Sequence, residues 1–152
     1  MGVRFIIGLV LMALPFGLGI AAGGAGLLLF LEWISAVLVI FPPFFVIFMS
    51  FSPPEIKAAF VHVFSKKSDP DANYARDIVF FTTWQRSAIL SGVIGALIGL
   101  ICILANLRDM VSVGQGMATM LLASLYAAIL YLTIILPCLT VVKKKQALRE
   151  GR

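Results

Sequence analysis

The chain carries few side chains that can do chemistry in water, and those few are scattered. Cys102 and Cys138 form no CxxC pair, and His62 is the single histidine. Neither a GxxxxGK[ST] phosphate-binding loop nor an HExxH metal motif occurs. We therefore predict no enzymatic activity, no resident cofactor and no metal ion, and we interpret His62 as a surface or interface residue.

The remaining chemistry is the movement of ions across a membrane, which needs an ionisable group at membrane depth. Four long apolar runs contain no Asp, Glu, Lys or Arg: residues 5–24, 33–51, 87–105 and 116–137. Glu32 lies at the outer end of the second run, at the expected membrane interface. Either the chain transports nothing, or a partner supplies the carboxylate.

Composition explains what these runs are. Of the 152 residues, 61% are hydrophobic and 12% are charged, and the mean hydropathy is +1.07. Soluble domains carry about 25% charged residues, and a spanning helix needs about 20 apolar residues. The runs are continuously apolar, which excludes a β-barrel. We predict one all-α membrane domain over residues 1–152 with four transmembrane helices.

The basic residues set the orientation of these helices. Of the twelve Lys and Arg residues, only Arg108 falls in a loop on the outer side, and the rest flank the other ends of the runs. Positive residues collect on the cytoplasmic side, so both termini, a short hairpin over residues 52–86 and a basic tail over residues 138–152 are predicted to be cytoplasmic. The same pattern argues against nucleic-acid binding, because the net charge of +5 belongs to the membrane flanks.

The hairpin has a readable start. Ser52 is a predicted helix cap, Pro53 suits the first helical position, and Glu55 completes a capping box. The expected apolar face comprises Ile56, Phe60, Val63 and Phe64. Residues 68–71 are expected to end this helix, and the next helix is expected to run from about Ala72 without a break into the third span.

The third and fourth spans differ from plain lipid anchors. Small or polar residues recur at helical spacing along the third span: Ala88, Gly92, Gly95, Gly99, Cys102 and Asn106. The fourth span shows a second such face: Thr119, Ala123, Tyr126, Leu130, Thr133 and Pro137. Small residues on one face allow another helix to approach closely.

These segments resemble the MotA/TolQ/ExbB proton channel family, and four spans favour its MotA branch. The resemblance covers most of the chain in the right order. Its motifs are residues 92–100 (GVIGALIGL), 104–109 (LANLRD), 114–126 and 136–137, with 32–35 (EWIS) and 50–60 (SFSPPEIKAAF) upstream.

The resemblance implies a stator-type motor subunit in the bacterial inner membrane. Five copies would form a ring around a dimer of a single-span protein similar to MotB, ExbD or TolR, whose aspartate carries the proton. Flow driven by the proton motive force would turn the ring around that dimer.

Site residues follow from the same resemblance. Ser124 matches a pore-facing threonine, and Ala96 matches a position that is threonine in sodium-driven members, which favours a proton over sodium. Pro137 matches a proline that couples ion flow to motion. The implied pore-lining set is Ala96, Ser124, Thr119, Ala123 and Tyr126, and the implied packing set against the partner helices is Gly92, Gly95 and Gly99.

Two departures leave the coupling open. Ile89 and Gln115 stand where the family has prolines, and the hairpin is far shorter than in flagellar members. The load driven, a flagellar rotor or another envelope machine, therefore stays open. A second interpretation also remains, in which the chain is a non-conducting four-helix scaffold or assembly factor.

Overall fold

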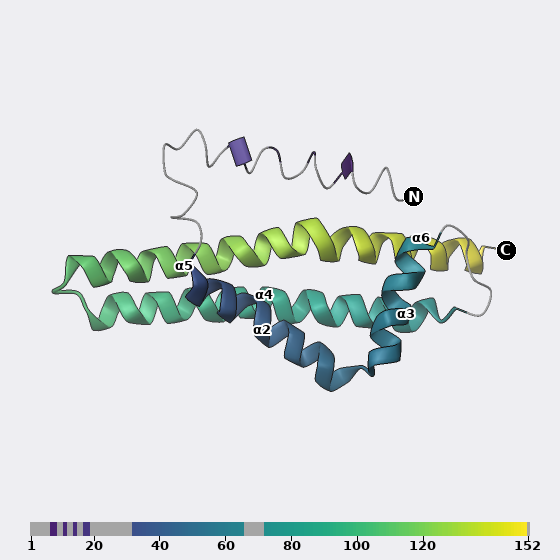
Figure 1. Cartoon of the computed structure of the whole chain (residues 1–152), viewed down its shortest axis with the longest axis horizontal. Coiled ribbons are helices and arrows are strands. Elements are labelled where there is room, and N and C mark those ends of the chain that lie inside the picture. The colour runs from purple at the N-terminus through teal and green to yellow at the C-terminus, as the bar shows by residue number, and fades with distance from the viewer. Residues whose placement is uncertain are drawn as a thin grey trace.

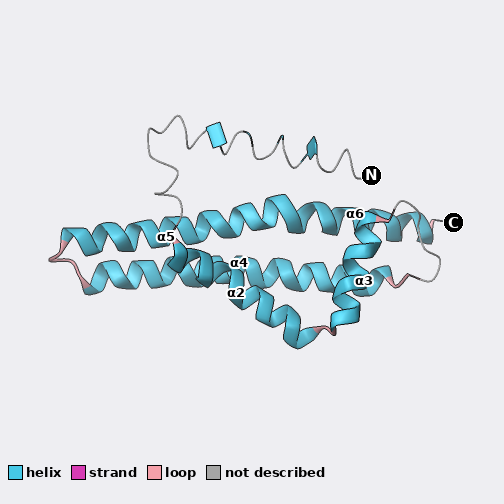
Figure 2. Cartoon of the chain, viewed as in Figure 1, coloured by secondary structure: helices cyan, strands magenta, loops and turns pink. Residues whose placement is uncertain are grey.

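The computed structural model describes residues 32–65 and 72–151, together with positions 7, 8, 11, 14, 17 and 18. The predicted first span over residues 5–24 therefore lies largely outside the described residues, and so does the predicted break at residues 68–71. The described ranges are helices joined by short loops, as Figure 2 shows.

Within the described ranges, three helical segments are long and apolar enough to cross a membrane: α2 (Trp33–Ser50), α4 (Tyr74–Ala105), and the continuous segment Met110–Glu150. The last comprises α5 (Met110–Leu130), a π-helical segment η2 (Tyr131–Ile135) and α6 (Leu136–Glu150). They contain the second, third and fourth predicted spans. The chain is thus an all-α, multi-pass membrane protein.

The two longest helical segments form an antiparallel pair, with α2 crossing them obliquely (Figure 1). At about 1.5 Å per residue, the 32 residues of α4 extend about 48 Å, well beyond a hydrocarbon core of about 30 Å. The expectation that one helix runs from the hairpin into the third span is confirmed. The excess length lies at the N-terminal end of α4, where α3 and α6 pack against it. We call this region of α3, α4 and α6 the base.

Helix α3 (Pro53–Phe64) begins where its sequence predicts. The backbone N–H of Ser52 donates a 2.8 Å hydrogen bond to the Glu55 carboxylate, and this carboxylate also pairs with Arg76 of α4 at 2.9 Å. Hydrogen bonds from Ser52 hold the pKa of Glu55 below its usual value. The carboxylate therefore stabilises the fold above its unfolded pKa, and this contribution is lost as the pH falls through the lowered value.

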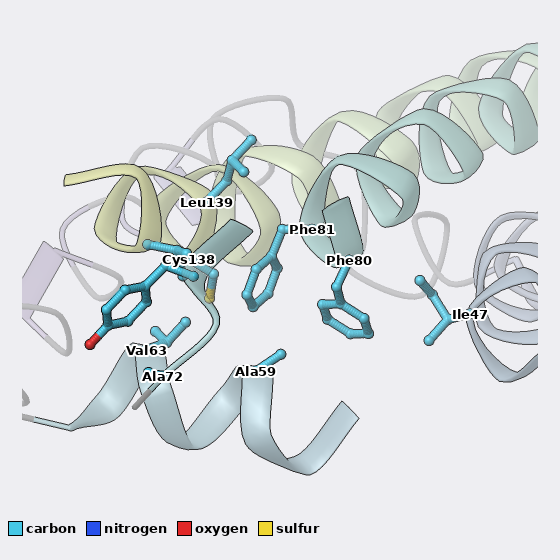
Figure 3. Close-up of a cluster of buried hydrophobic side chains, with 10 residues drawn as sticks. Ile47, Ala59, Val63, Ala72, Phe80, Phe81, Cys138 and Leu139 are labelled. Carbon is cyan, nitrogen blue, oxygen red and sulfur yellow. The ribbon is translucent and has the colours of Figure 1, made fainter. Parts of the chain in front are cut away.

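The base has its own hydrophobic core, where α3 meets the C-terminal end of α2, the N-terminal part of α4 and the first turns of α6 (Figure 3). Phe80 and Phe81 of α4 are almost fully buried, and the ring of Phe60 meets both edge-on. Phe64 was expected on the buried face of α3 but is 56% exposed, and Ala59 is buried instead.

A buried ionic cluster also ties the base together. His62 Nδ1 lies 2.7 Å from the carboxylate of Asp77, whose side chain is 5% exposed. Lys145 of α6 is buried and donates hydrogen bonds to the carbonyl oxygens of His62 and Ser65. Burial lowers the pKa of Lys145, and the negative charge of Asp77 partly opposes this shift. His62 is thus an interface residue, as expected, whereas Lys145 is no free tail charge.

Replacing Asp77 with alanine should destabilise the chain by about 3 kcal/mol, because it leaves the His62 ring without its hydrogen-bond partner and the buried Lys145 without a nearby carboxylate. Thermal unfolding in detergent, followed by circular dichroism, measures the effect. Glu55→Gln is the matched control, since it breaks the other acid–base contact between α3 and α4 at a more exposed position and should have a much smaller effect. Equal effects of the two variants would contradict the assignment.

Candidate ion-pathway site

The seam between α4 and α5 depends on glycine. A Cβ on Gly99 would lie 2.6 Å from the backbone N of Met120 and 2.7 Å from the carbonyl oxygen of Gly116, and one on Gly95 would lie 2.6 Å from the Ala123 Cβ. Gly92 likewise meets Ala127. The glycine face therefore receives the chain's own α5. Gly95 and Gly99, which were expected to pack against a partner helix, thus pack within this chain, whereas Gly92 also lines the groove described below.

A tight turn, predicted to lie on the outer side, brings α4 and α5 together. The carboxylate of Asp109 accepts hydrogen bonds from the backbone N–H of Val111 at 3.1 Å and from the Ser112 hydroxyl. These bonds, Ser112 first, lower the pKa of Asp109. The capped turn starts α5 at Met110, earlier than the predicted span at residue 116, so the outer loop is only a few residues long.

Helix α2 covers one side of the seam. Val39 is fully buried and packs with Ala123 and Ala127, and the Leu38 Cβ would touch a side chain placed at Gly95. Ala123, predicted to line the pore, is therefore buried between helices of its own chain. This position corrects that prediction.

The other side of the seam opens into a groove of about 420 Å³ that α4 and α5 form between them. Ala96 and Ser124 both line it, so the structure brings together the two residues that the family resemblance singled out. Ile89, which stands in place of a family proline, lies in the same groove. The lining includes no charged side chain among the described residues.

Ser124 has its hydroxyl on this groove, and it donates a 3.0 Å hydrogen bond to the carbonyl oxygen of Met120. Membrane hydroxyls often bond to their own helix in this way. The hydroxyl oxygen keeps its lone pairs for a ligand. The groove is thus an uncharged, mainly apolar surface whose polar side-chain groups are the hydroxyls of Ser124 and Tyr131.

Thr119 and Tyr126 point elsewhere. The Thr119 hydroxyl lies 2.7 Å from the Glu32 carboxylate, and the Tyr126 hydroxyl oxygen accepts a 3.1 Å hydrogen bond from the backbone N–H of Glu32. Both residues therefore face α2, away from the groove of Ala96 and Ser124. The five predicted pore residues therefore lie in three places. Ala96 and Ser124 line the groove, Ala123 is buried in the seam, and Thr119 and Tyr126 contact α2.

Pro137 lies two residues beyond a helical irregularity that the sequence did not predict. Tyr131–Ile135 form a π-helical turn, in which hydrogen bonds reach one residue further than in an α-helix. The available signal was Pro137 itself, because proline lacks the N–H that would continue the α-helical pattern. Such turns occur often at functional sites, and this one adjoins Tyr131, which also lines the groove.

Fold and site together define a helical, multi-pass membrane protein whose two longest helices present an open, uncharged groove. A model of the MotA/TolQ/ExbB proton channel family matches residues 58–150, more than half of the chain, and the chain therefore belongs to this family. The matched range runs from within α3 to the end of α6.

Two curated relatives are similar over shorter stretches. Motility protein A of Borreliella burgdorferi is 42% identical over 50 residues, which are 33% of this chain and 19% of that protein. Motility protein A of Aquifex aeolicus is 44% identical over 64 residues, or 40% of this chain and 25% of that protein. The matches thus span a quarter or less of each relative, and they support a MotA-like member of the family.

Proposed function

We propose that the chain is the pore-forming subunit of a proton-driven, stator-type rotary complex in the bacterial inner membrane. Five copies surround a dimer of a single-span protein similar to MotB, ExbD or TolR, and the aspartate of each partner helix carries the proton. Both termini and the base formed by α3, α4 and α6 lie in the cytoplasm.

The groove between α4 and α5 carries this proposal. It is apolar, free of charged side chains in the described part of the chain, and lined by Ala96 and Ser124. An apolar partner helix with one acidic residue suits such a surface, because a charged residue is costly in lipid and needs a sheltered, partly polar lining. The Ser124 hydroxyl offers the acid a hydrogen-bond partner.

A proton is the ion we propose. A sodium ion needs several oxygen ligands in place of its water shell, and Ala96 contributes none. The side chains that line the groove offer only two oxygen atoms, the hydroxyls of Ser124 and Tyr131, and the rest of the lining is apolar. A carboxylic acid moving past such a surface as a neutral group needs no cage of ligands.

The assembly state tests the subunit proposal. We expect the purified chain in mild detergent to give the mass of a ring of five copies by native mass spectrometry. Coexpression with the single-span partner should add the mass of a partner dimer to that ring. A stable monomer or dimer that binds no such partner would contradict the proposal and favour the non-conducting scaffold.

A further inference from the structure

A polar cluster lies at the outer end of α2, on the side of α5 away from the groove. The two carboxylate oxygens of Glu32 accept hydrogen bonds from the Thr119 and Ser35 hydroxyls. Ser35 is fully buried and Thr119 is 9% exposed. Thr119 lies about one turn inside the predicted fourth span, so this carboxylate bonds to groups at membrane depth.

Each of these hydroxyls has a second acceptor in place. Thr119 Oγ1 lies 3.1 Å from the carbonyl oxygen of Gln115, and Ser35 Oγ lies 3.3 Å from the carbonyl oxygen of Thr119. A hydroxyl has one proton to donate and can also accept. Each hydroxyl can therefore donate either to the carboxylate or to a backbone carbonyl.

This arrangement satisfies two protonation states of Glu32. When the carboxyl group is ionised, both hydroxyls donate to it. When it is protonated, its O–H donates to one hydroxyl, which rotates to donate to its backbone carbonyl. No buried donor or acceptor loses its partner in either state, so the usual penalty for an unpaired buried group is avoided.

No basic side chain neutralises Glu32 within the described ranges. The cluster contains no ion pair, and the packed segments α2, α5 and residues 87–105 of α4 carry no charged residue. Tyr126 is the other titratable group in contact with Glu32. Within the part of the chain that the structure describes, hydrogen bonds alone stabilise the ionised carboxylate, and a bound proton would neutralise it.

A cavity of about 430 Å³ gives access to the cluster. Its lining begins with Glu32 and Trp33 and continues between α2 and α5 as far as Thr133. The polar groups of the lining belong to Glu32, Tyr126, Thr133 and the indole N–H of Trp33. The rest of the lining is apolar. A carboxyl group at the mouth of such a cavity can exchange a proton with the outer side while its hydrogen-bond partners stay sheltered.

We propose that Glu32 is a reversible proton-binding site of this chain, a second titrating acid of the complex beside that of the partner. A proton from the outer side binds the carboxylate and later leaves it, so charge and atoms balance without any co-reactant. The role of this site on the proton route rests on the proposed function. The proposal adds an acid of this chain to the one that the partner is expected to supply.

Infrared difference spectroscopy of the full chain in lipid nanodiscs tests proton binding without any partner. A pH step should produce a protonated-carboxyl signal that disappears in Glu32→Gln and persists in Glu55→Gln, which removes an exposed carboxylate of the base. In Thr119→Val the signal should move, because one hydrogen-bond donor to the ionised group is gone. A spectrum that Glu32→Gln leaves unchanged would overturn the proposal.

Proton flux through the assembled complex tests the role of the site on the route. Compared with Glu55→Gln, the Glu32→Gln variant should lower the flux by about tenfold or more, as expected for loss of a group that transfers protons. Unchanged flux in Glu32→Gln would overturn the route assignment while leaving the motor subunit intact. Absence of flux in the native complex would instead contradict the proposed function, and the infrared signal alone would then decide on the site.

Discussion

Replacing Gly99 with alanine should destabilise the helix pair by about 3 kcal/mol. The added methyl group would lie 2.6 Å from the Met120 backbone N and 2.7 Å from the Gly116 carbonyl oxygen, and backbone atoms cannot rotate away as a side chain can. The two helices must separate, which loses contacts along the whole seam. Unfolding of the purified chain in a detergent and denaturant series measures the change.

Two comparisons show whether the seam is responsible. Gly114→Ala is the matched control, because no atom lies within 4 Å of a Cβ there, and its stability should be unchanged. Gly92→Ala should also destabilise, but its clash is with the Ala127 methyl group, so the double variant with Ala127→Gly should recover most of the loss. A Gly99→Ala chain as stable as Gly114→Ala would show that the seam does not pack as described.

Phenylalanine in place of Ser124 should abolish proton flux through the assembled complex without preventing membrane insertion. Ser124 is exposed on the groove, so the fold can accept a large apolar side chain there. The ring would fill the space that we assign to a partner helix and remove the hydroxyl. Flux in vesicles that contain the chain and its single-span partner measures function, and the amount in the membrane fraction measures insertion.

The control for this experiment carries the same ring elsewhere. Val37 lies on α2 and is 40% exposed, outside the lining of the groove, so Val37→Phe should insert and conduct normally. Ser124→Ala separates the two effects of the substitution, since it removes the hydroxyl but leaves the space. Normal flux in Ser124→Phe would remove Ser124 from the pore.

Much of the fold is predictable because its signals are local. Apolar runs locate the second, third and fourth spans. The start of α3 is located by Ser52, Pro53 and Glu55, which lie within a few positions of one another in the chain. Such features depend on hydrophobicity and on hydrogen bonds between near neighbours, so no knowledge of the tertiary contacts is needed.

The site was predictable only in part, because it depends on which faces meet. The spacing of Gly92, Gly95 and Gly99 shows that some helix packs closely, but it cannot show that this helix is α5 of the same chain. The resemblance singled out Ala96 and Ser124, and both line the same groove, but their place in a pore stays a prediction. The contact of Glu32 with Thr119 joins residues 87 positions apart, so no local sequence pattern predicts it.

Helical phase was the other obstacle. Counting α-helical turns along the fourth span places Thr119, Ala123 and Pro137 on one face. In the structure the buried positions continue instead as Ile135 and then Cys138, Leu139 and Val142, because the π-helical turn adds a residue between the two halves. The single buried face expected along the fourth span is therefore divided into two faces, one on α5 and one on α6.

That wide turn at Tyr131–Ile135 has a mechanical consequence. One additional residue rotates everything that follows by about 100° around the helix axis, so a single straight rod presents its outer half to the glycines of α4 and its inner half to the aromatic cluster around Phe81. Deleting one residue within the turn would swing the inner half a quarter of a revolution out of alignment. The two halves of the segment Met110–Glu150 pack against different partners, and the π-helical turn sets the angle between their packing faces.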